Sequence, residues 1–181
     1  MGVGAFNLVR AAAYERAGTH RRIAMRPDDD VKLGKILKQS GARQHVLGGR
    51  GMIVVEWYRS LPEMVRGLRK NTFAGLDYSL ARVAAAVLVS LVVNVWPFVA
   101  VVALRGPARL LNAIAALLLV GMFAHSARLQ RSKPWLAIGY PVAALIHVYI
   151  LCAAVAATLR RGGISWRGTH YPLDELRANR V

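Results

Sequence analysis

Residues 83–104 read VAAAVLVSLVVNVWPFVAVVAL, a run without a single charged side chain. An α-helix rises about 1.5 Å per residue, so this run is long enough to cross a hydrocarbon core of about 30 Å. Two more apolar runs follow, at about 108–125 and 135–159. The sequence therefore predicts an α-helical membrane region of about three transmembrane helices within residues 82–160. The second helix is expected to be the shortest, because its uncharged centre extends only over about 110–124.

The composition agrees with a membrane protein that has a small, basic, water-facing part. The chain has 181 residues, 55% of them hydrophobic, and a formal net charge of +16. Up to Ala81 there are 14 Lys and Arg against 7 Asp and Glu, and the remaining 100 residues hold 11 against 2. The high apolar fraction excludes a disordered chain. The single cysteine, Cys152, excludes a disulfide scaffold and a CxxC metal site. About 80 water-facing residues are few for an independent enzyme domain.

Two strongly polar side chains, Asn94 and His147, lie deep in the predicted transmembrane helices. Residues of this kind either line a polar pathway or form hydrogen bonds between helices. No carboxylate accompanies them in these runs. We therefore favour an interhelical hydrogen bond as their role.

The orientation in the membrane is left open by the charges. The loop that carries Arg128, Arg131 and Lys133 is the most basic short connection, which favours a cytoplasmic location. Three complete crossings would then place the basic tail, residues 161–181, on the side opposite to residues 1–80. The same charge bias disfavours that arrangement. Either the short second run is re-entrant or interfacial, or the charge rule is broken in this chain.

The water-facing part shows signals for short helices and strands. Residues 1–7 are expected to form a glycine-rich loop or a short strand. Helices are expected at 10–17 and 31–39, because each of these segments is followed by a glycine of the kind that ends helices. Strand-like segments, joined by a glycine-rich connection, are expected at 44–47 and 52–57.

A capping box marks the start of a further helix, since Ser60 is followed three residues later by Glu63. The helix predicted over 60–81 is amphipathic, with Arg66 and Arg69 on its polar side, and it continues directly into the first transmembrane helix. Such a helix suits a position along the bilayer surface.

The only cluster of carboxylates is Asp28-Asp29-Asp30, directly before the helix predicted at 31–39. One of these carboxylates could act as a general base, and oxygen ligation of a divalent cation is another possibility. The simplest interpretation is that the cluster stabilises the N-terminus of the helix and is otherwise solvated.

Three motifs in this order carry a resemblance to a known family. They are G-x-G-A-F-N-L-V-R-x-x-A-Y from residue 2, R-P-D-D-D-V-K-L-G-K-x-L-K-x-S-G from residue 26, and V-E-W-Y from residue 55. Together they resemble the acceptor half of membrane-bound, inverting family 2 glycosyltransferases. The lipid-acceptor members are the most similar in character, such as ceramide glucosyltransferase-like, hopanoid-pathway and carotenoid glycosyltransferases. The resemblance covers about residues 2–176.

This resemblance implies an α+β fold class, in which part of a GT-A catalytic domain precedes the membrane helices. Residues 1–59 would be the acceptor-side part, 60–81 the interface helix, and 161–181 a basic tail that returns toward the active site. In the family an acidic pair, followed after two intervening residues by Leu, opens a helix, and its Asp deprotonates the acceptor hydroxyl. Residues 29–33 match that spacing. The resemblance therefore places the catalytic base on Asp30, with Asp29 in the position of the family's Glu.

The resemblance also implies residues that bind substrate or diphosphate. The family's Gln/Arg-x-x-Arg-Trp motif matches Arg66 and Arg69, but Lys70 stands where the family has Trp. The segment from Gly163 to Tyr171 resembles the I-x-W-R/K-G/T-x-x-Y segment that follows the last spans in lipid-acceptor members. Trp166 and Arg167 would accordingly lie near the active site, as would Asn7 from the first motif. We expect Asp30, Arg66, Arg69 and Trp166 to converge on one cleft at the membrane surface.

The residues taken by themselves also fit a membrane protein that is not an enzyme. Arg66 and Arg69 could bind lipid headgroups, and Trp166 could belong to an interfacial aromatic belt. A second hypothesis is therefore a non-catalytic, small, basic membrane protein that acts as a partner subunit or is a remnant.

A complete family 2 enzyme also needs a donor-binding N-terminal half. That half carries the Asp-x-Asp for a divalent cation, Mg or Mn, so the metal ligands are expected to be absent from this chain. A fragment, a mis-called start codon or a split gene with a separate N-terminal half would each explain this. The expected partners are the lipid bilayer, a nucleotide-sugar donor and a lipid acceptor, with no nucleic acid. The expected location is a bacterial inner membrane, with the catalytic part on the cytoplasmic face.

Overall fold

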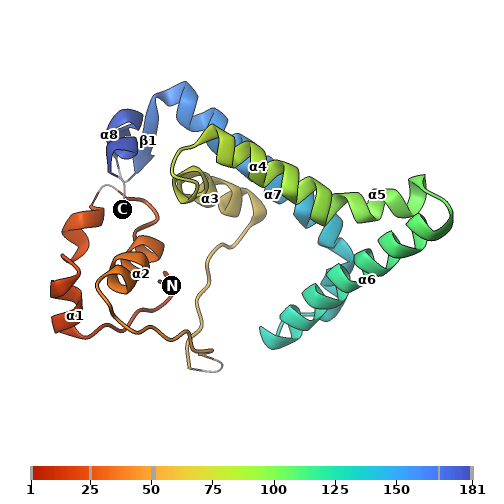
Figure 1. The fold of residues 1–181 in the computed structure, drawn as a ribbon, viewed down its shortest axis with the longest axis horizontal. Helices are drawn as coiled ribbons and strands as arrows, with labels where there is room; N and C mark the ends of the chain where they lie inside the picture. The colour runs from red at the N-terminus through yellow and green to blue at the C-terminus, as the bar shows by residue number, and fades with distance from the viewer. Residues whose placement is uncertain (1, 25, 50–51, 167, 180–181) are drawn as a thin grey trace. The chain divides into compact units, whose positions relative to one another are not determined.

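The computed structural model describes residues 2–24, 26–49, 52–166 and 168–179, with Trp166 described by its backbone alone. The chain divides into two compact units, whose elements are drawn in Figure 1. Unit 1 combines Met1–Ser79 with Ala154–Val181, and unit 2 is Leu80–Ala153. Unit 1 therefore unites the two ends of the chain, although the whole of unit 2 separates them in the sequence.

The prediction of three membrane-length helices is confirmed. Three helical segments are long and apolar enough to cross a bilayer: Leu80–Ala103, Gly106–Leu129 and Pro134–Arg161. The first comprises α4 (Leu80–Ser90), the π-helical turn η2 (Leu91–Val95) and α5 (Trp96–Ala103). The second is α6 (Gly106–Leu129), and the third begins as the 3₁₀ helix η3 (Pro134–Gly139) and continues as α7 (Tyr140–Arg161).

The second helix is longer than its uncharged centre suggested. Helix α6 has 24 residues because polar residues near its two ends remain helical. The Asn112 side chain, for example, donates to the carbonyl of Ala108 one turn earlier, at 2.9 Å, so the helix itself satisfies this amide. By length and hydropathy, α6 is therefore a candidate span like the other two.

The π-helical turn η2 has a local cause in the sequence. Pro97 stands in the first turn of α5 and has no N–H to donate to the carbonyl four residues earlier. The helix widens into η2 directly before this residue, as helices often do where an internal hydrogen bond is lost. The turn brings Asn94 into contact with another helix, because Tyr140 Oη donates to Asn94 Oδ1 at 2.6 Å. The predicted interhelical hydrogen bond is thereby confirmed for Asn94, and for His147 it stays a prediction.

The N-terminal part of unit 1 contains short helices around a small apolar core. Its helices are α1 (Ala11–Arg16), the 3₁₀ helix η1 (His20–Ile23), α2 (Asp29–Gln39) and α3 (Leu61–Gly75). The core consists of five buried residues from η1, α2 and the turn that follows α1: Ala17, Ile23, Leu33, Ile36 and Leu37. The helices expected at 10–17 and 31–39 are thus confirmed, and α2 begins early enough to include Asp29 and Asp30.

The capping box is also confirmed, because the Ser60 hydroxyl accepts from the Glu63 N–H at 3.4 Å. The helix ends earlier than predicted, at Gly75 rather than near residue 81. Asp77 and Tyr78 follow it with φ values of 51° and 55°, a left-handed conformation that breaks the helix before α4 begins. The prediction of one continuous helix over 60–81 is therefore wrong.

The predicted strands at 44–47 and 52–57 are absent, and this prediction is wrong as well. Neither segment forms a ladder with any described residue, and Met52 lies in a turn in which its N–H donates to the Gly49 carbonyl at 3.1 Å. β-Branched residues favour extended backbone, whereas a strand also needs a neighbour that accepts and donates its hydrogen bonds. The described sheet instead lies in the tail, where β1 (Gly163–Trp166) pairs antiparallel with β2 (Thr169–Pro172). Helix α8 (Leu173–Ala178) packs on this hairpin.

Candidate functional site

Asp30 lies in the first turn of α2, directly under the glycine-rich N-terminal segment. A Cβ at Gly2 would overlap the carbonyl oxygen of Asp30. A Cβ at Gly4 would lie 2.8 Å from Asp30 Oδ2 and 3.3 Å from Trp57 Cη2. The two glycines therefore allow the N-terminal backbone to rest on the start of α2, and the Asp30 carboxylate and the Trp57 indole both approach Gly4.

Asn7 holds this glycine-rich segment in shape. Its Oδ1 accepts from the Val3 N–H at 3.2 Å, and its Nδ2 donates to the Val3 carbonyl at 2.9 Å. Both ends of the amide are thus used within the segment. The substrate-binding role expected for Asn7 stays a prediction, and the contacts assign it a positioning role next to Asp30.

The segment after Val55 connects the surroundings of Asp30 with helix α3. Trp57 lies against Gly4, and the ring of the next residue, Tyr58, covers Gly67 on α3, where a Cβ would lie 2.5 Å from Tyr58 Cε1. Arg66 and Arg69 stand on either side of Gly67 in the sequence, the first exposed and the second half-buried. Within the described residues neither arginine forms an ion pair or hydrogen bond with Asp30.

The tail residues of the predicted site lie outside the described residues. Neither Arg167 nor the side chain of Trp166 is among the described parts of the chain. The expected convergence of Asp30, Arg66, Arg69 and Trp166 on one cleft therefore stays a prediction.

Asp28, the first of the three aspartates, has a structural role. It is buried with Arg26, and the two side chains form a bidentate pair with distances of 2.8 Å and 2.9 Å. Arg26 Nη2 also donates to the Ala74 carbonyl at 2.9 Å and to Asp77 Oδ1 at 3.2 Å. Lys32 Nζ donates to the same Asp77 oxygen at 2.8 Å. We refer to Arg26, Asp28, Lys32 and Asp77 as the charge network.

The charge network fixes α2 to the end of α3 and separates the roles of the aspartates. Burial lowers the pKa of Arg26, but the hydrogen bond with Asp28 and the negative charges of Asp28 and Asp77 outweigh this effect and raise the pKa. Arg26 therefore remains charged. Because both oxygens of Asp28 face Arg26, Asp28 does not form a metal-binding pair with Asp30. Arg26 opens one of the three motifs, but neither it nor Asp77 is marked in the sequence as a member of a buried network, and only their contact across 51 positions reveals this role.

Tyr78 packs against the apolar side of the charge network. Its side chain is 2% exposed, meets the Phe73 ring edge-on at 5.3 Å, and lies 5.7 Å from Arg26 Cζ. Its hydroxyl has no hydrogen-bond partner among the described residues. Burial raises the pKa of Tyr78 far above its ordinary value, and the positive charge of Arg26 offsets only part of this rise.

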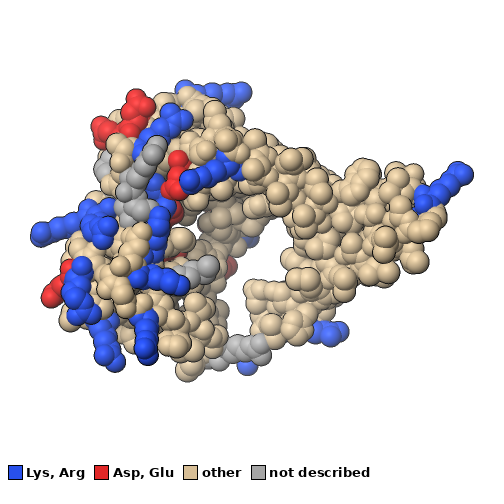
Figure 2. Space-filling view, viewed as in Figure 1, with Lys and Arg blue, Asp and Glu red and all other residues tan. Residues whose placement is uncertain are grey.

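The described residues carry many basic side chains but no metal site. They contain no group of three or more His, Cys, Asp or Glu side chains that could hold a metal ion. Figure 2 shows Lys and Arg gathered over unit 1, whereas unit 2 is largely without charge between the ends of its helices.

Comparisons with known proteins add no family. No protein-family model, curated protein or solved structure matches the chain. The function of the chain is therefore inferred from its residues and their contacts.

The close approach of Gly2 to α2 leads to a first prediction. Gly2→Ala would force the N-terminal segment off the Asp30 carbonyl, because the contact is with rigid backbone. We expect amide hydrogen exchange in residues 2–9 to become about fivefold faster or more, which corresponds to a loss of about 1 kcal/mol. Gly48→Ala is the matched control, since a Cβ at Gly48 meets nothing within 4 Å. Equal exchange in the two variants would contradict the proposed contact.

The buried Tyr78 leads to a second prediction, on the pH dependence of stability. The folded state favours the neutral phenol of Tyr78 because burial raises its pKa. The neutral phenol therefore contributes fully to the stability of the fold below the pKa of an unfolded tyrosine, about 10, and this contribution is lost as the pH rises above that value. Tyr78→Phe removes this loss and also removes a buried hydroxyl without a described partner. We expect the free energy of unfolding of the natural chain, relative to Tyr78→Phe, to fall between about pH 10 and 11, by up to about 1.4 kcal/mol. Parallel pH profiles in detergent would contradict this account.

Proposed function

We propose that the chain is the acceptor-side and membrane part of an inverting glycosyltransferase that transfers a sugar from a nucleotide-sugar donor to a lipid-type hydroxyl. The observation that supports this proposal most directly is the contact of Gly4, Asp30 and Trp57. These residues come from the three separate motifs that carry the family resemblance. Three motifs that meet around one carboxylate are what a shared catalytic role would require.

In the proposed reaction, Asp30 is the general base. It takes the proton of the acceptor hydroxyl while that oxygen forms a bond to the anomeric carbon of the donor sugar. The bond from the anomeric carbon to the phosphate oxygen breaks on the opposite side, so the configuration inverts and a nucleoside diphosphate leaves. Asp30 is half-buried at a helix N-terminus, and its Oδ2 lies close to Gly4 and forms no ion pair with a described residue.

The roles of the other proposed residues follow from their charge and position. Arg66 and Arg69 would contact the diphosphate, for which guanidinium groups are well suited. Tyr58 holds the backbone between these residues close to the segment that carries Trp57. Asp29, in the first turn of α2, would support the base, and Trp166 and Arg167 would contribute from the tail. Mg or Mn would be held by the Asp-x-Asp of the donor-binding half.

The proposal includes a separate donor-binding half, and the exposure of residues 53–58 supports the presence of such a half. Residues 53–58 belong to no helix or strand, and the exposed fraction alternates along this part of the chain, from 84% at Met52 to 42% at Ile53 and from 91% at Val54 to 42% at Val55. No described backbone group pairs with residues 54–58. A segment that is rich in apolar, β-branched residues and has unpaired backbone groups is normally covered by another strand. We propose that the donor-binding half supplies it, on the cytoplasmic face of a bacterial inner membrane.

One test compares sugar transfer in membranes of cells whose natural copy of the chain is altered. Asp30→Asn keeps the shape of the side chain but removes the base, so we expect transfer from nucleotide-sugar to extracted lipid to fall at least about 100-fold. The control is Glu15→Gln, which changes an exposed carboxylate on α1 and should leave transfer unchanged.

Two outcomes would contradict the proposal. Near-natural transfer by Asp30→Asn would show that Asp30 is not the base. Unchanged lipid glycosylation after deletion of the whole chain would favour the second hypothesis, a non-catalytic partner subunit that uses the basic surface of unit 1 (Figure 2).

A further inference from the structure

We propose that the chain crosses the bilayer twice and enters it a third time only to half depth. The re-entrant segment is formed by η3 and the first half of α7, and not by the short second apolar run. Residues 1–79, the loop at 130–133 and the tail then all face the same side of the membrane. This proposal concerns the membrane topology and does not depend on the proposed glycosyltransferase activity.

A hydrogen bond fixes the depth at which α7 begins. Tyr140, the first residue of α7, donates to Asn94 in the middle of the first membrane helix. At about 1.5 Å per residue, Asn94 lies roughly 21 Å from Leu80 and roughly 14 Å from Ala103. The Tyr140 ring also contacts Phe98 at 6.1 Å and Phe123 at 5.6 Å. Helix α7 therefore begins inside unit 2, between the levels of Asn94 and Phe123, rather than at a surface.

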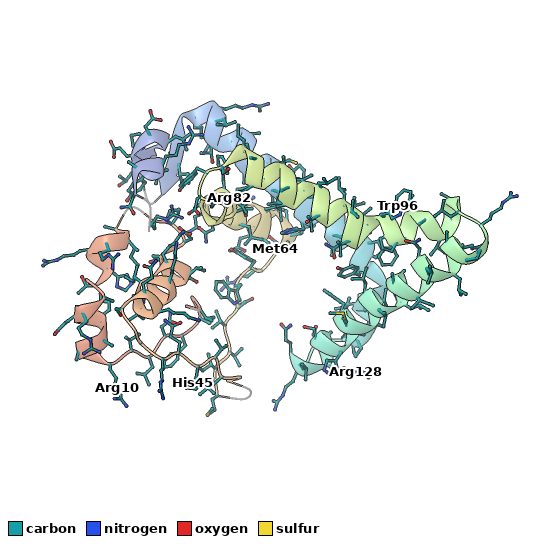
Figure 3. All side chains as sticks on the ribbon, in the orientation of Figure 1. Arg10, His45, Met64, Arg82, Trp96 and Arg128 are labelled. Carbon is teal, nitrogen blue, oxygen red and sulfur yellow. The ribbon has the colours of Figure 1, made fainter. Side chains whose placement is uncertain are left out.

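Helix η3 carries the chain from the membrane surface to this depth. Helix α6 ends at Leu129, and Arg131 and Lys133 follow, which places this turn at a water surface (Figure 3 labels Arg128 at the same end of α6). Helix η3 has six residues and rises about 2 Å per residue, so it covers about 12 Å, close to half of a 30 Å core. It packs against α6 and exposes Trp135 and Ile138, as expected of a re-entrant segment that is supported by protein on one side.

The environment of the side chains changes along α7. Val142, Leu145 and Tyr149 are 50–61% exposed, as lipid-facing residues are in the absence of a bilayer. Buried positions begin about ten residues after Tyr140 and are between 0% and 4% exposed: Ile150, Leu151, Ala154 and Thr158. Ten residues of helix cover about 15 Å, the distance from the bilayer centre to its surface. Helix α7 passes from unit 2 into unit 1 at Ala154, which lies about 21 Å along the helix from Tyr140, the same length that separates Asn94 from Leu80.

The direction in which α7 leaves follows from unit 1. This compact unit contains both Ser79, directly before the first membrane helix, and the chain from Ala154 onward. One compact unit outside the bilayer lies on one side of it. The first helix and α6 then make two complete crossings, and α7 returns to the side from which α4 started.

This topology removes the conflict among the basic residues. The turn between α5 and α6, on the far side, carries only Arg105 and Arg109 near the membrane. All other basic clusters, including the loop with Arg128, Arg131 and Lys133 and the tail, lie on the near side. The charge rule is then obeyed, and the near side is cytoplasmic.

The only cysteine gives a direct test with the natural chain. In the re-entrant topology, Cys152 lies about 18 Å along α7 from Tyr140, at the cytoplasmic edge of the bilayer core, and its side chain is exposed. We expect a membrane-impermeant maleimide to label Cys152 in inverted vesicles, which expose the cytoplasmic face. The same reagent should not label Cys152 in right-side-out vesicles. If the whole segment Pro134–Arg161 crossed the bilayer, Cys152 would lie within the hydrocarbon or at the opposite surface, about 30 Å from Pro134. Labelling in neither preparation, or only in right-side-out vesicles, would therefore overturn the proposal.

Single cysteines in a Cys152→Ala background extend the test to the other segments. Ser132→Cys and Ser165→Cys should be labelled from the same face, and Ala108→Cys from the opposite face. Val93→Cys, which is 50% exposed at the middle of the first membrane helix, is the buried-in-lipid control and should be labelled from neither face. Labelling of Ser132→Cys and Ser165→Cys from opposite faces would establish three complete crossings and overturn the proposal.

Discussion

The ion pair between Arg26 and Asp28, with its extension to Asp77, is the interaction on which unit 1 depends. The side chains of Arg26 and Asp28 are 1% and 6% exposed, so either charge alone would be strongly unfavourable in this place. Their pairing fixes the start of α2, and the bonds from Arg26 to Ala74 and Asp77 attach that start to the end of α3. The helix that carries Asp30 is thereby joined to the residues that lead into the first membrane helix.

The same network explains why α3 stops where it does. Asp77 can reach Arg26 and Lys32 only if the chain turns away from the helix axis, and residues 77 and 78 do so with positive φ values. Left-handed backbone at non-glycine residues costs about 1–2 kcal/mol each, and the contacts of Asp77 and the burial of Tyr78 offset this cost. In unit 2 the corresponding constraint is the hydrogen bond of Tyr140 with Asn94, which fixes where α7 begins.

Much of this architecture can be read from local sequence. Long uncharged runs define the membrane helices, and Ser60 with Glu63 defines the start of α3, because these signals depend on neighbouring residues. Contacts between distant residues cannot be read in this way. Asp28 and Asp30 look alike in the sequence, and only the position of Arg26 makes one of them structural. The segments at 44–47 and 52–57 have strand composition, but pairing depends on a partner strand that the described residues do not supply.

The central claim, that Arg26 couples α2 to the end of α3, is tested most directly by a double-mutant cycle. The free energy of unfolding in detergent would be measured for Arg26→Met, Asp77→Asn, the double variant and the natural chain. We predict a coupling energy of about 1 kcal/mol or more, because the two side chains share one buried network. A coupling energy close to zero, with additive losses from the two single variants, would contradict the account.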